Sequence, residues 1–86
     1  MRIGRAKKTI PDDLLIIRNS NNRGDLIEMH KTGARYYLTV TDGASGRFIV
    51  SNGYASLRRA TKDYIKVSYL IENNIYDFDF WASIVD

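Results

Sequence analysis

Apolar and polar residues alternate along residues 35–41, as they do in β-strands with one buried face, and residues 47–51 are also rich in residues that favour strands. The residues between them, 42–46, include Asp and Gly, which tolerate positive φ, so they predict a five-residue hairpin loop. Upstream, a Thr-Gly pair at 32–33 predicts a two-residue loop after residues 26–31. This part of the chain is therefore expected to form three consecutive antiparallel strands.

Each loop fixes a strand register, and the two registers must agree on which face is apolar because side chains alternate along a strand. The first loop predicts that Met29 lies opposite Tyr36, and the second predicts that Val40 lies opposite Phe48. Both registers gather apolar residues on one face: Ile27, Met29, Tyr36, Leu38, Val40, Phe48 and Val50. The other face is expected to be mostly polar: Glu28, His30, Arg35, Tyr37, Thr39, Thr41, Arg47, Ile49 and Ser51.

A helix that covers the apolar face is expected next in the chain. Apolar residues recur at three- and four-residue steps through residues 54–71, which is the spacing of one helical stripe. Ser51 or Asn52 is the expected N-cap, and Asn73 suits the C-terminal end. The pattern predicts an amphipathic helix over about residues 53–72.

The N-terminal part divides into an arm and a fourth strand. Residues 1–9 have no hydrophobic periodicity and are expected to form a flexible basic arm, whereas residues 10–86 form a single small domain. Pro11 and the aspartates after it suit the start of a short helix. We instead favour a buried strand that contains the aliphatic run at residues 14–17 and ends near Asn19, because that run is short. The expected fold class is α+β: a three- to four-stranded antiparallel β-meander covered by one amphipathic helix.

Two patterns overlap near the C-terminus. Aromatic and acidic residues alternate over residues 76–80, as in a strand, but Phe78, Trp81 and Val85 also share one helical face with Asp77 as a cap. We favour a short helix. Because these aromatic side chains are too apolar to remain in water, the segment is expected to dock on the core or on a partner. The expected contact residues are Tyr76, Phe78, Phe80 and Trp81.

Composition narrows the class of protein. The chain has 86 residues, no cysteine and a net charge of +3, so neither disulfides nor thiolate metal sites are expected to support its small core. No apolar run approaches the ~20 residues of a membrane span, so no membrane partner is expected and the protein is expected to be cytoplasmic.

Residues that support catalysis are scarce. The single histidine, His30, is expected on the polar sheet face between Glu28 and the cross-strand Arg35, which favours a surface role. Acidic residues do not have the spacing of a zinc or calcium site, and the glycines at 43 and 46 are explained by the hairpin. We therefore expect no enzymatic activity, no catalytic residue, no metal and no cofactor.

Basic residues instead favour nucleic-acid binding. Each of three basic features also fits an ordinary solvent-exposed surface, but together they indicate contact with phosphates and bases. In the arm they are Arg2, Arg5, Lys7 and Lys8; on the polar sheet face they are Arg35 and Arg47, with Tyr37 beside them; on the helix they are Arg58, Arg59, Lys62 and Lys66. The sequence thus predicts a small binding module for nucleic acid, with DNA favoured over RNA.

A family resemblance agrees with that prediction over about forty of the 86 residues. It is carried by Arg35-Tyr36-Tyr37-Leu38-Thr39-Val40, the turn at 42–46, Arg47-Phe48-Ile49-Val50, then Gly53-Tyr54-Ala55-Ser56 and Ala60. These residues resemble the ββα pattern of arm-type DNA-binding domains at the start of tyrosine recombinases of mobile elements. They are also similar to small ββα domains of unknown function. The resemblance implies the fold and a DNA contact through the sheet.

An alternative function is binding to another protein. A compact basic chain with an aromatic C-terminal segment also fits a phage or mobile-element protein that inhibits a host nucleic-acid-processing enzyme through protein–protein contact. A homodimer through the aromatic segment or through an open edge strand is a further alternative.

Overall fold

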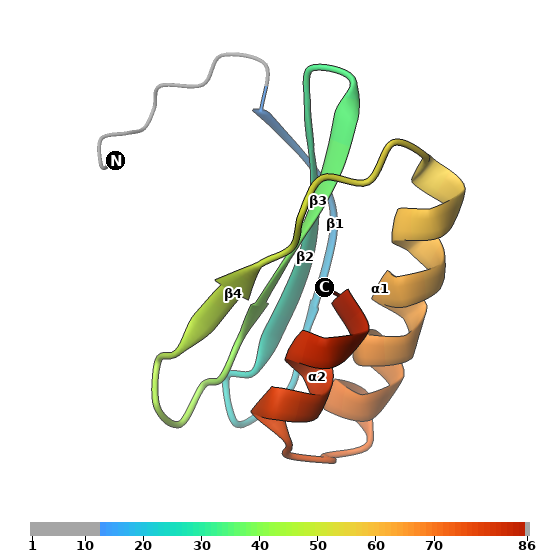
Figure 1. The fold of residues 1–86 in the computed structure, drawn as a ribbon. Coiled ribbons are helices and arrows are strands. Elements are labelled where there is room, and N and C mark those ends of the chain that lie inside the picture. The colour runs from blue at the N-terminus through green and yellow to red at the C-terminus, as the bar shows by residue number, and fades with distance from the viewer. Residues whose placement is uncertain (1–12, 86) are drawn as a thin grey trace.

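The computed structural model describes residues 13–85 and contains a four-stranded antiparallel sheet and two helices (Figure 1). The strands lie across the sheet in chain order: β1 Asp13–Ser20, β2 Leu26–Thr32, β3 Arg35–Thr41 and β4 Phe48–Val50. The helices are α1 Leu57–Glu72 and α2 Phe78–Val85. The predicted α+β meander with a fourth strand is confirmed. The predicted arm, with Arg2, Arg5, Lys7 and Lys8, lies outside the described residues.

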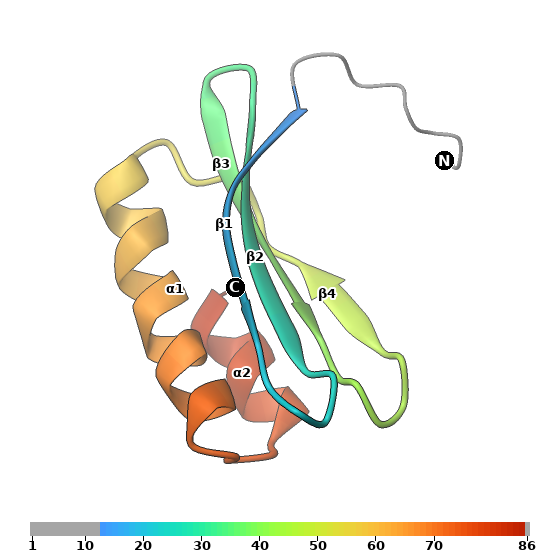
Figure 2. The ribbon, with the colours of Figure 1, turned by 180° about the vertical axis from the view of Figure 1, so that it is seen from behind.

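Both helices cover the same face of the sheet, and β1 forms one of its two edges (Figure 1 and Figure 2). The buried stripe of α1 consists of Ala60, Tyr64, Val67 and Ile71. It packs on the buried residues of the two central strands, Ile27, Met29, Leu38 and Val40. Full burial of one such aliphatic side chain stabilises the fold by roughly 1.5–3 kcal/mol. This small core holds the helices to the sheet.

The hairpin between β2 and β3 differs from the prediction by one loop position. Thr32 pairs with Arg35, so the two-residue loop is Gly33-Ala34, and Met29 lies opposite Leu38 rather than Tyr36. Moving a two-residue loop by one position shifts every cross-strand partner by two residues. Because side chains alternate with a period of two, the apolar face is unchanged.

The hairpin between β3 and β4 has a different register from the predicted one, and the facing of β4 was wrong. The Asp42 N–H donates to the Arg47 carbonyl oxygen at 2.8 Å, so Asp42 closes the hairpin instead of belonging to its loop. Val40 consequently pairs with Ile49, which packs against the core. Phe48 and Val50 turn to the open face of the sheet, where the Phe48 side chain is 68% exposed.

The helix α1 begins four residues later than predicted because Tyr54 still belongs to the sheet. The Tyr54 N–H donates to the Tyr36 carbonyl oxygen at 2.7 Å, and the Tyr36 N–H donates to the Tyr54 carbonyl oxygen at 2.9 Å. Ser56 is the N-cap, and its hydroxyl accepts a hydrogen bond from the Arg59 N–H. Ser51, one of the two expected caps, instead accepts a bond from the Leu38 N–H at 2.9 Å.

The C-terminal segment forms the favoured short helix, α2, with Asp77 accepting a hydrogen bond from the Phe80 N–H. Trp81 is completely buried and its indole N–H donates to the Ile75 carbonyl oxygen at 3.0 Å. No helix within residues 13–85 is long and apolar enough to cross a membrane.

Candidate nucleic-acid interface

The predicted basic residues of α1 all lie on its exposed surface, away from the stripe that packs on the sheet. They are Arg58, Arg59, Lys62 and Lys66. The buried stripe at positions 60, 64, 67 and 71 directs the remaining positions of the helix toward solvent. Arg58 and Arg59 stand in the first turn, where α1 has no acidic residue, and α1 also lacks a basic residue in its last turn. The charges of α1 therefore oppose its macrodipole.

Arg35 lies close to the start of this helix although it belongs to β3. It is exposed, and its guanidinium donates a hydrogen bond to the carbonyl oxygen of Gly53, in the segment that leads into α1. A side chain on Gly53 would collide with Arg35 and contact the Tyr37 ring. Arg35 and Tyr37 are thus held together beside this segment, as the sequence predicted for their shared face.

Lys31 joins the same region from β2. It pairs with Tyr36, which in turn pairs with Tyr54 ahead of α1. The β2–β3 hairpin and the first turn of α1 accordingly lie at one end of the molecule (Figure 1). We call this region the basic end, and its residues are Lys31, Arg35, Arg58, Arg59 and Lys62.

A shallow pocket of about 220 Å³ lies within the basic end. Its lining is Tyr54, Arg59, Lys62 and Asp63. The Tyr54 hydroxyl lies 2.8 Å from an Asp63 carboxylate oxygen and 3.0 Å from the Val85 carbonyl oxygen. Tyr54 therefore connects the pocket to both helices, and Asp63 lines the pocket together with the two cations, Arg59 and Lys62.

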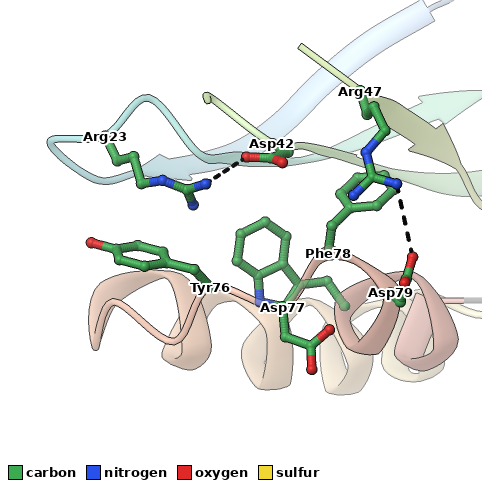
Figure 3. A pocket seen from close by; sticks show the side chains of 8 residues that line it. Arg23, Asp42, Arg47, Tyr76, Asp77, Phe78 and Asp79 are labelled. Carbon is green, nitrogen blue, oxygen red and sulfur yellow. Dashed lines mark hydrogen bonds and ion pairs between the residues drawn. The ribbon is translucent and has the colours of Figure 1, made fainter. Parts of the chain in front are cut away.

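Arg47 does not belong to the basic end. The register of β4 turns it toward α2, where its guanidinium lies 4.5 Å from the centre of the Phe78 ring and 4.0 Å from an Asp79 carboxylate oxygen (Figure 3). Arg23 makes a similar contact, 4.2 Å from the centre of the Tyr76 ring. The prediction that Arg47 stands beside Arg35 on the polar sheet face was wrong.

A pocket of about 250 Å³ lies between these two arginine–aromatic pairs. Aspartates surround it, and Asp42 binds Arg23 at 3.0 Å (Figure 3). The pKa of Asp42 is lowered mainly because the Ser45 hydroxyl donates to its carboxylate at 2.9 Å. The Ala44 N–H and the charges of Arg23 and Arg47 lower the pKa further, whereas desolvation by burial opposes this shift. Arg23 is therefore neutralised here and is not a free phosphate ligand.

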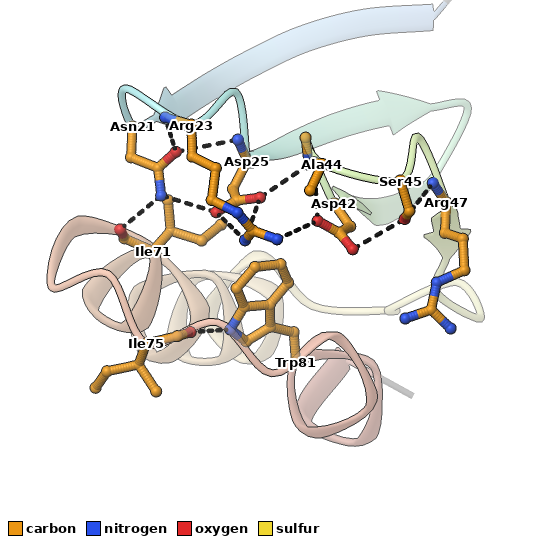
Figure 4. Close-up of polar contacts among 11 residues, drawn as sticks. Asn21, Arg23, Asp25, Asp42, Ala44, Ser45, Arg47, Ile71, Ile75 and Trp81 are labelled. Carbon is orange, nitrogen blue, oxygen red and sulfur yellow. Dashed lines mark hydrogen bonds and ion pairs between the residues drawn. The ribbon is translucent and has the colours of Figure 1, made fainter.

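A buried polar network beneath this pocket was not foreseen from the sequence. Asp25 is completely buried, accepts hydrogen bonds from Asn21, Arg23 and the Gly43 N–H, and so ties the β1–β2 loop to the β3–β4 loop (Figure 4). Asn21 also donates to the carbonyl oxygen of Ile71 near the end of α1. The one signal in the sequence that could have indicated this network is the placement of Asn21, Arg23 and Asp25 at every second position. Composition alone predicts only a loop there.

The predicted partner-binding aromatics divide into two kinds. Trp81 is fully buried and Phe78 packs edge-to-face on it, so both stabilise the domain. Tyr76 and Phe80 are half exposed. Phe80 also lines an apolar groove of about 640 Å³ between the helices, with Ile65, Lys66, Tyr69, Leu70 and Ile84. Partner binding by Tyr76 and Phe80 stays a prediction.

His30 lies on the open face of the sheet, as predicted. Its two ring nitrogens are each 3.4 Å from a carboxylate oxygen, one of Asp13 and one of Glu28. Glu28 also accepts a hydrogen bond from Thr39. Residues 13–85 contain no cluster of three or more His, Cys, Asp or Glu residues able to hold a metal ion.

No protein-family model, curated protein or solved structure matches the chain. The resemblance to arm-type DNA-binding domains rests on the residues of the strand–turn–strand–helix segment alone.

Proposed function

We propose that this protein is a small non-enzymatic module that binds nucleic acid, DNA in preference to RNA, through its basic end. The observation that carries the proposal is the position of Arg58 and Arg59 in the first turn of α1. Cations at a helix N-terminus are unfavourable by roughly 0.3–1 kcal/mol each because the helix dipole is positive there. A bound phosphate would turn this repulsion into attraction, since the dipole and the side chains then act on the same anion.

The arrangement around these arginines supports contact with a phosphate backbone. Lys31, Arg35 and Lys62 come from three different elements that meet at the same end of the molecule as the helix start, so the charge is concentrated in space more than along the chain. Arg35 is fixed by its bond to Gly53, which lowers the entropy lost when it binds. Nearby Tyr37 offers an aromatic surface for stacking on a base or sugar.

The distribution of acidic residues supports one orientation of binding. Glu72, Asp77 and Asp79 lie at the opposite end of α1 and at the start of α2. A polyanion is attracted to one end of the molecule and repelled from the other. The preference for DNA comes from the resemblance of residues 35–60 to arm-type DNA-binding domains, and the proposed location is the cytoplasm.

Fluorescence anisotropy with labelled duplex DNA, single-stranded DNA and RNA across a salt series tests the proposal. We expect wild-type affinity for duplex DNA to fall steeply with salt, and the variant carrying both Arg58→Ala and Arg59→Ala to lower the log–log salt slope by about 2. A variant with Arg47→Ala and Lys66→Ala loses the same charge elsewhere and is the matched control. Absence of binding at low salt, or equal losses in both variants, contradicts the proposal.

A further inference from the structure

The edge strand β1 exposes an unusually apolar surface. Leu14, Leu15, Ile16 and Ile17 are each between 45% and 58% exposed. The strand is eight residues long, whereas β4 at the other edge has only three. One side of β1 pairs with β2, and its other side has no strand beside it in the described part of the chain. Open edges of this length and composition readily pair with another strand.

A β-bulge in β1 determines which face each side chain occupies. Leu15 pairs with His30 and Ile17 pairs with Met29, so Ile16 is an extra residue without a partner of its own. Cross-strand partners share a face. Leu14 and Ile17 therefore lie on the helix-covered face with Lys31 and Met29, while Asp13 and Arg18 lie on the open face with Thr32 and Glu28.

This pattern is complementary to itself under a two-fold axis. In an antiparallel pair of identical strands, placing Asp13 opposite Arg18 of a second copy also places Leu14 opposite the second Ile17, and Leu15 opposite the second Ile16. Asp13 and Arg18 then share the open face, and Leu14 and Ile17 share the helix-covered face. A regular strand would not permit this, because Asp13 and Arg18 are five residues apart and would point to opposite faces. The bulge is what makes this register possible.

We propose that β1 pairs antiparallel with β1 of a second copy of this chain, in the register that faces Asp13 with Arg18. Opposite charges then stand at both ends of the segment, and aliphatic side chains meet at the axis. The exposed Arg18 side chain makes no ion pair or hydrogen bond within residues 13–85, so its charge is available to the second copy. The two sheets become one continuous sheet, and the two basic ends lie at opposite ends of the dimer.

The proposed contact is confined to one strand, so the dimer is weak. Interfaces below about 1,200 Å² are typical of transient association, and we expect dissociation in the range of about 1–100 µM. This inference is independent of the proposed function, because pairing through β1 requires no nucleic acid.

Sedimentation velocity of the full chain, without nucleic acid, over about 1–200 µM tests the proposal. We expect a monomer–dimer equilibrium for the wild type. Ile16→Lys places two positive charges at the axis, and we expect a monomer at every concentration. The matched control is Phe48→Lys on β4, which adds the same charge to a more exposed residue of the other edge and is expected to dimerise like the wild type. Circular dichroism melts establish that each variant is folded.

A charge exchange tests the register. Arg18→Asp places an aspartate opposite Asp13 of the other copy at each end of the segment, so like charges face each other. We expect dimer affinity to fall about fivefold. Adding Asp13→Arg restores opposite charges with their positions exchanged, and we expect affinity within about twofold of wild type. Failure of this rescue overturns the register. A wild-type chain that stays monomeric at about 200 µM overturns self-pairing and makes a strand of another protein the remaining occupant of the edge.

Discussion

At the scale of single residues, the position of Asp25 explains how two loops distant in sequence are held together. Its carboxylate is completely buried, yet it has several polar partners: Arg23 binds it at 2.9 Å, and the Gly43 N–H donates to it at 2.8 Å. A buried charge is tolerated when it is paired and hydrogen-bonded in this way. Removing Arg23 alone would leave the buried Asp25 carboxylate without its cation, with the Asn21 and Gly43 donors remaining.

Gly43 is the point at which this network is most sensitive to added volume. A Cβ at this position would overlap the backbone of Arg23 and Gly24. We expect Gly43→Ala to lower the free energy of unfolding by at least about 2 kcal/mol, because backbone must move and the bond to Asp25 is disturbed. Urea unfolding followed by circular dichroism measures this loss.

The control for that substitution is Gly46→Ala in the same loop. Gly46 has a φ of 77°, and a Cβ added there would meet no atom within 4 Å, so only backbone conformation opposes the change. We expect a loss of about 1 kcal/mol for Gly46→Ala. An equal or smaller loss for Gly43→Ala would show that close contact with the β1–β2 loop is unimportant.

The lowered pKa of Asp42 predicts part of the acid sensitivity of the fold. Ser45, the Ala44 N–H and Arg23 favour the carboxylate in the folded state, so the folded pKa lies below the ordinary value of 3.8. Asp42 therefore contributes stability above pH 3.8 that is lost as the pH falls through the lower folded value. We expect the stability difference between wild type and Asp42→Asn to shrink as the pH falls below 3.8.

Urea midpoints measured from neutral pH down to about pH 2 follow this difference. The comparison variant is Asp79→Asn, because the Asp79 side chain is 91% exposed and its only described ion pair is the 4.0 Å contact with Arg47. A stability difference for Asp42→Asn that stays constant across the acid range would exclude a stabilising role of its charge.

At the scale of elements, two neighbouring hairpins show how far sequence pattern determines register. The loop predicted from the Thr-Gly pair was misplaced by one residue, yet the apolar face of β2 and β3 was predicted correctly. The error shifts every cross-strand partner by two residues, which keeps each side chain on its face. The second loop was counted one residue too long, since Asp42 pairs with Arg47 instead of entering the loop. Local composition cannot distinguish these cases, because Asp42 is fixed by Arg23 from a distant loop.

The same limit applies to the candidate interface. The exposed face of α1 follows directly from its apolar period, so its four basic residues were predicted correctly as surface residues. The sequence also predicted that Arg35 and Tyr37 lie on the same face of the sheet. It misplaced Arg47 through the register error, and it did not assign Lys31 because that contact requires the pairing of Tyr36 with Tyr54.

The helix α2 provides a prediction at the element scale. Trp81 is fully buried and bonds the Ile75 carbonyl oxygen, whereas Phe80 is 50% exposed. We expect Trp81→Ala to lower the free energy of unfolding by about 3–5 kcal/mol through loss of apolar contacts and of that bond. Phe80→Ala is expected to change it by less than about 1 kcal/mol.

Chemical unfolding monitored by far-ultraviolet circular dichroism measures both changes. Trp81→Phe keeps most of the volume, so it provides a folded variant if Trp81→Ala proves too unstable to study; we expect it to lose less than Trp81→Ala. Similar effects of Trp81→Ala and Phe80→Ala would mean that α2 is not anchored through its buried face.

At the scale of the whole molecule, stability and the proposed binding place opposite demands on the start of α1. Electrostatics of the folded chain alone favour acidic residues there, but the first turn contains Arg58 and Arg59. The cations of the basic end also repel one another. Proteins commonly lose some stability at sites that serve a function, because the groups needed for binding are not those that best stabilise the fold. The proposed binding of an anion by the basic end would account for cations at this position.

Arg58→Glu tests that conflict directly. The new carboxylate interacts favourably with the helix N-terminus and, four residues on, with Lys62, so we expect the free energy of unfolding to rise by about 0.5 kcal/mol. For a domain of this size the melting temperature rises by about 2–4 °C. On the proposed function, affinity for duplex DNA is expected to fall, because the proposed phosphate contact would be replaced by repulsion.

The control is Lys66→Glu, which makes the same charge change beyond the first turn of α1, where the dipole has little effect. We expect its melting temperature to stay within about 1 °C of wild type. Thermal melts and anisotropy titrations on the same samples separate the two effects. A gain in stability without a loss of DNA affinity would show that the arginines of the first turn take no part in binding. Both changes together would indicate that these arginines lower the stability of the fold but bind an anionic partner.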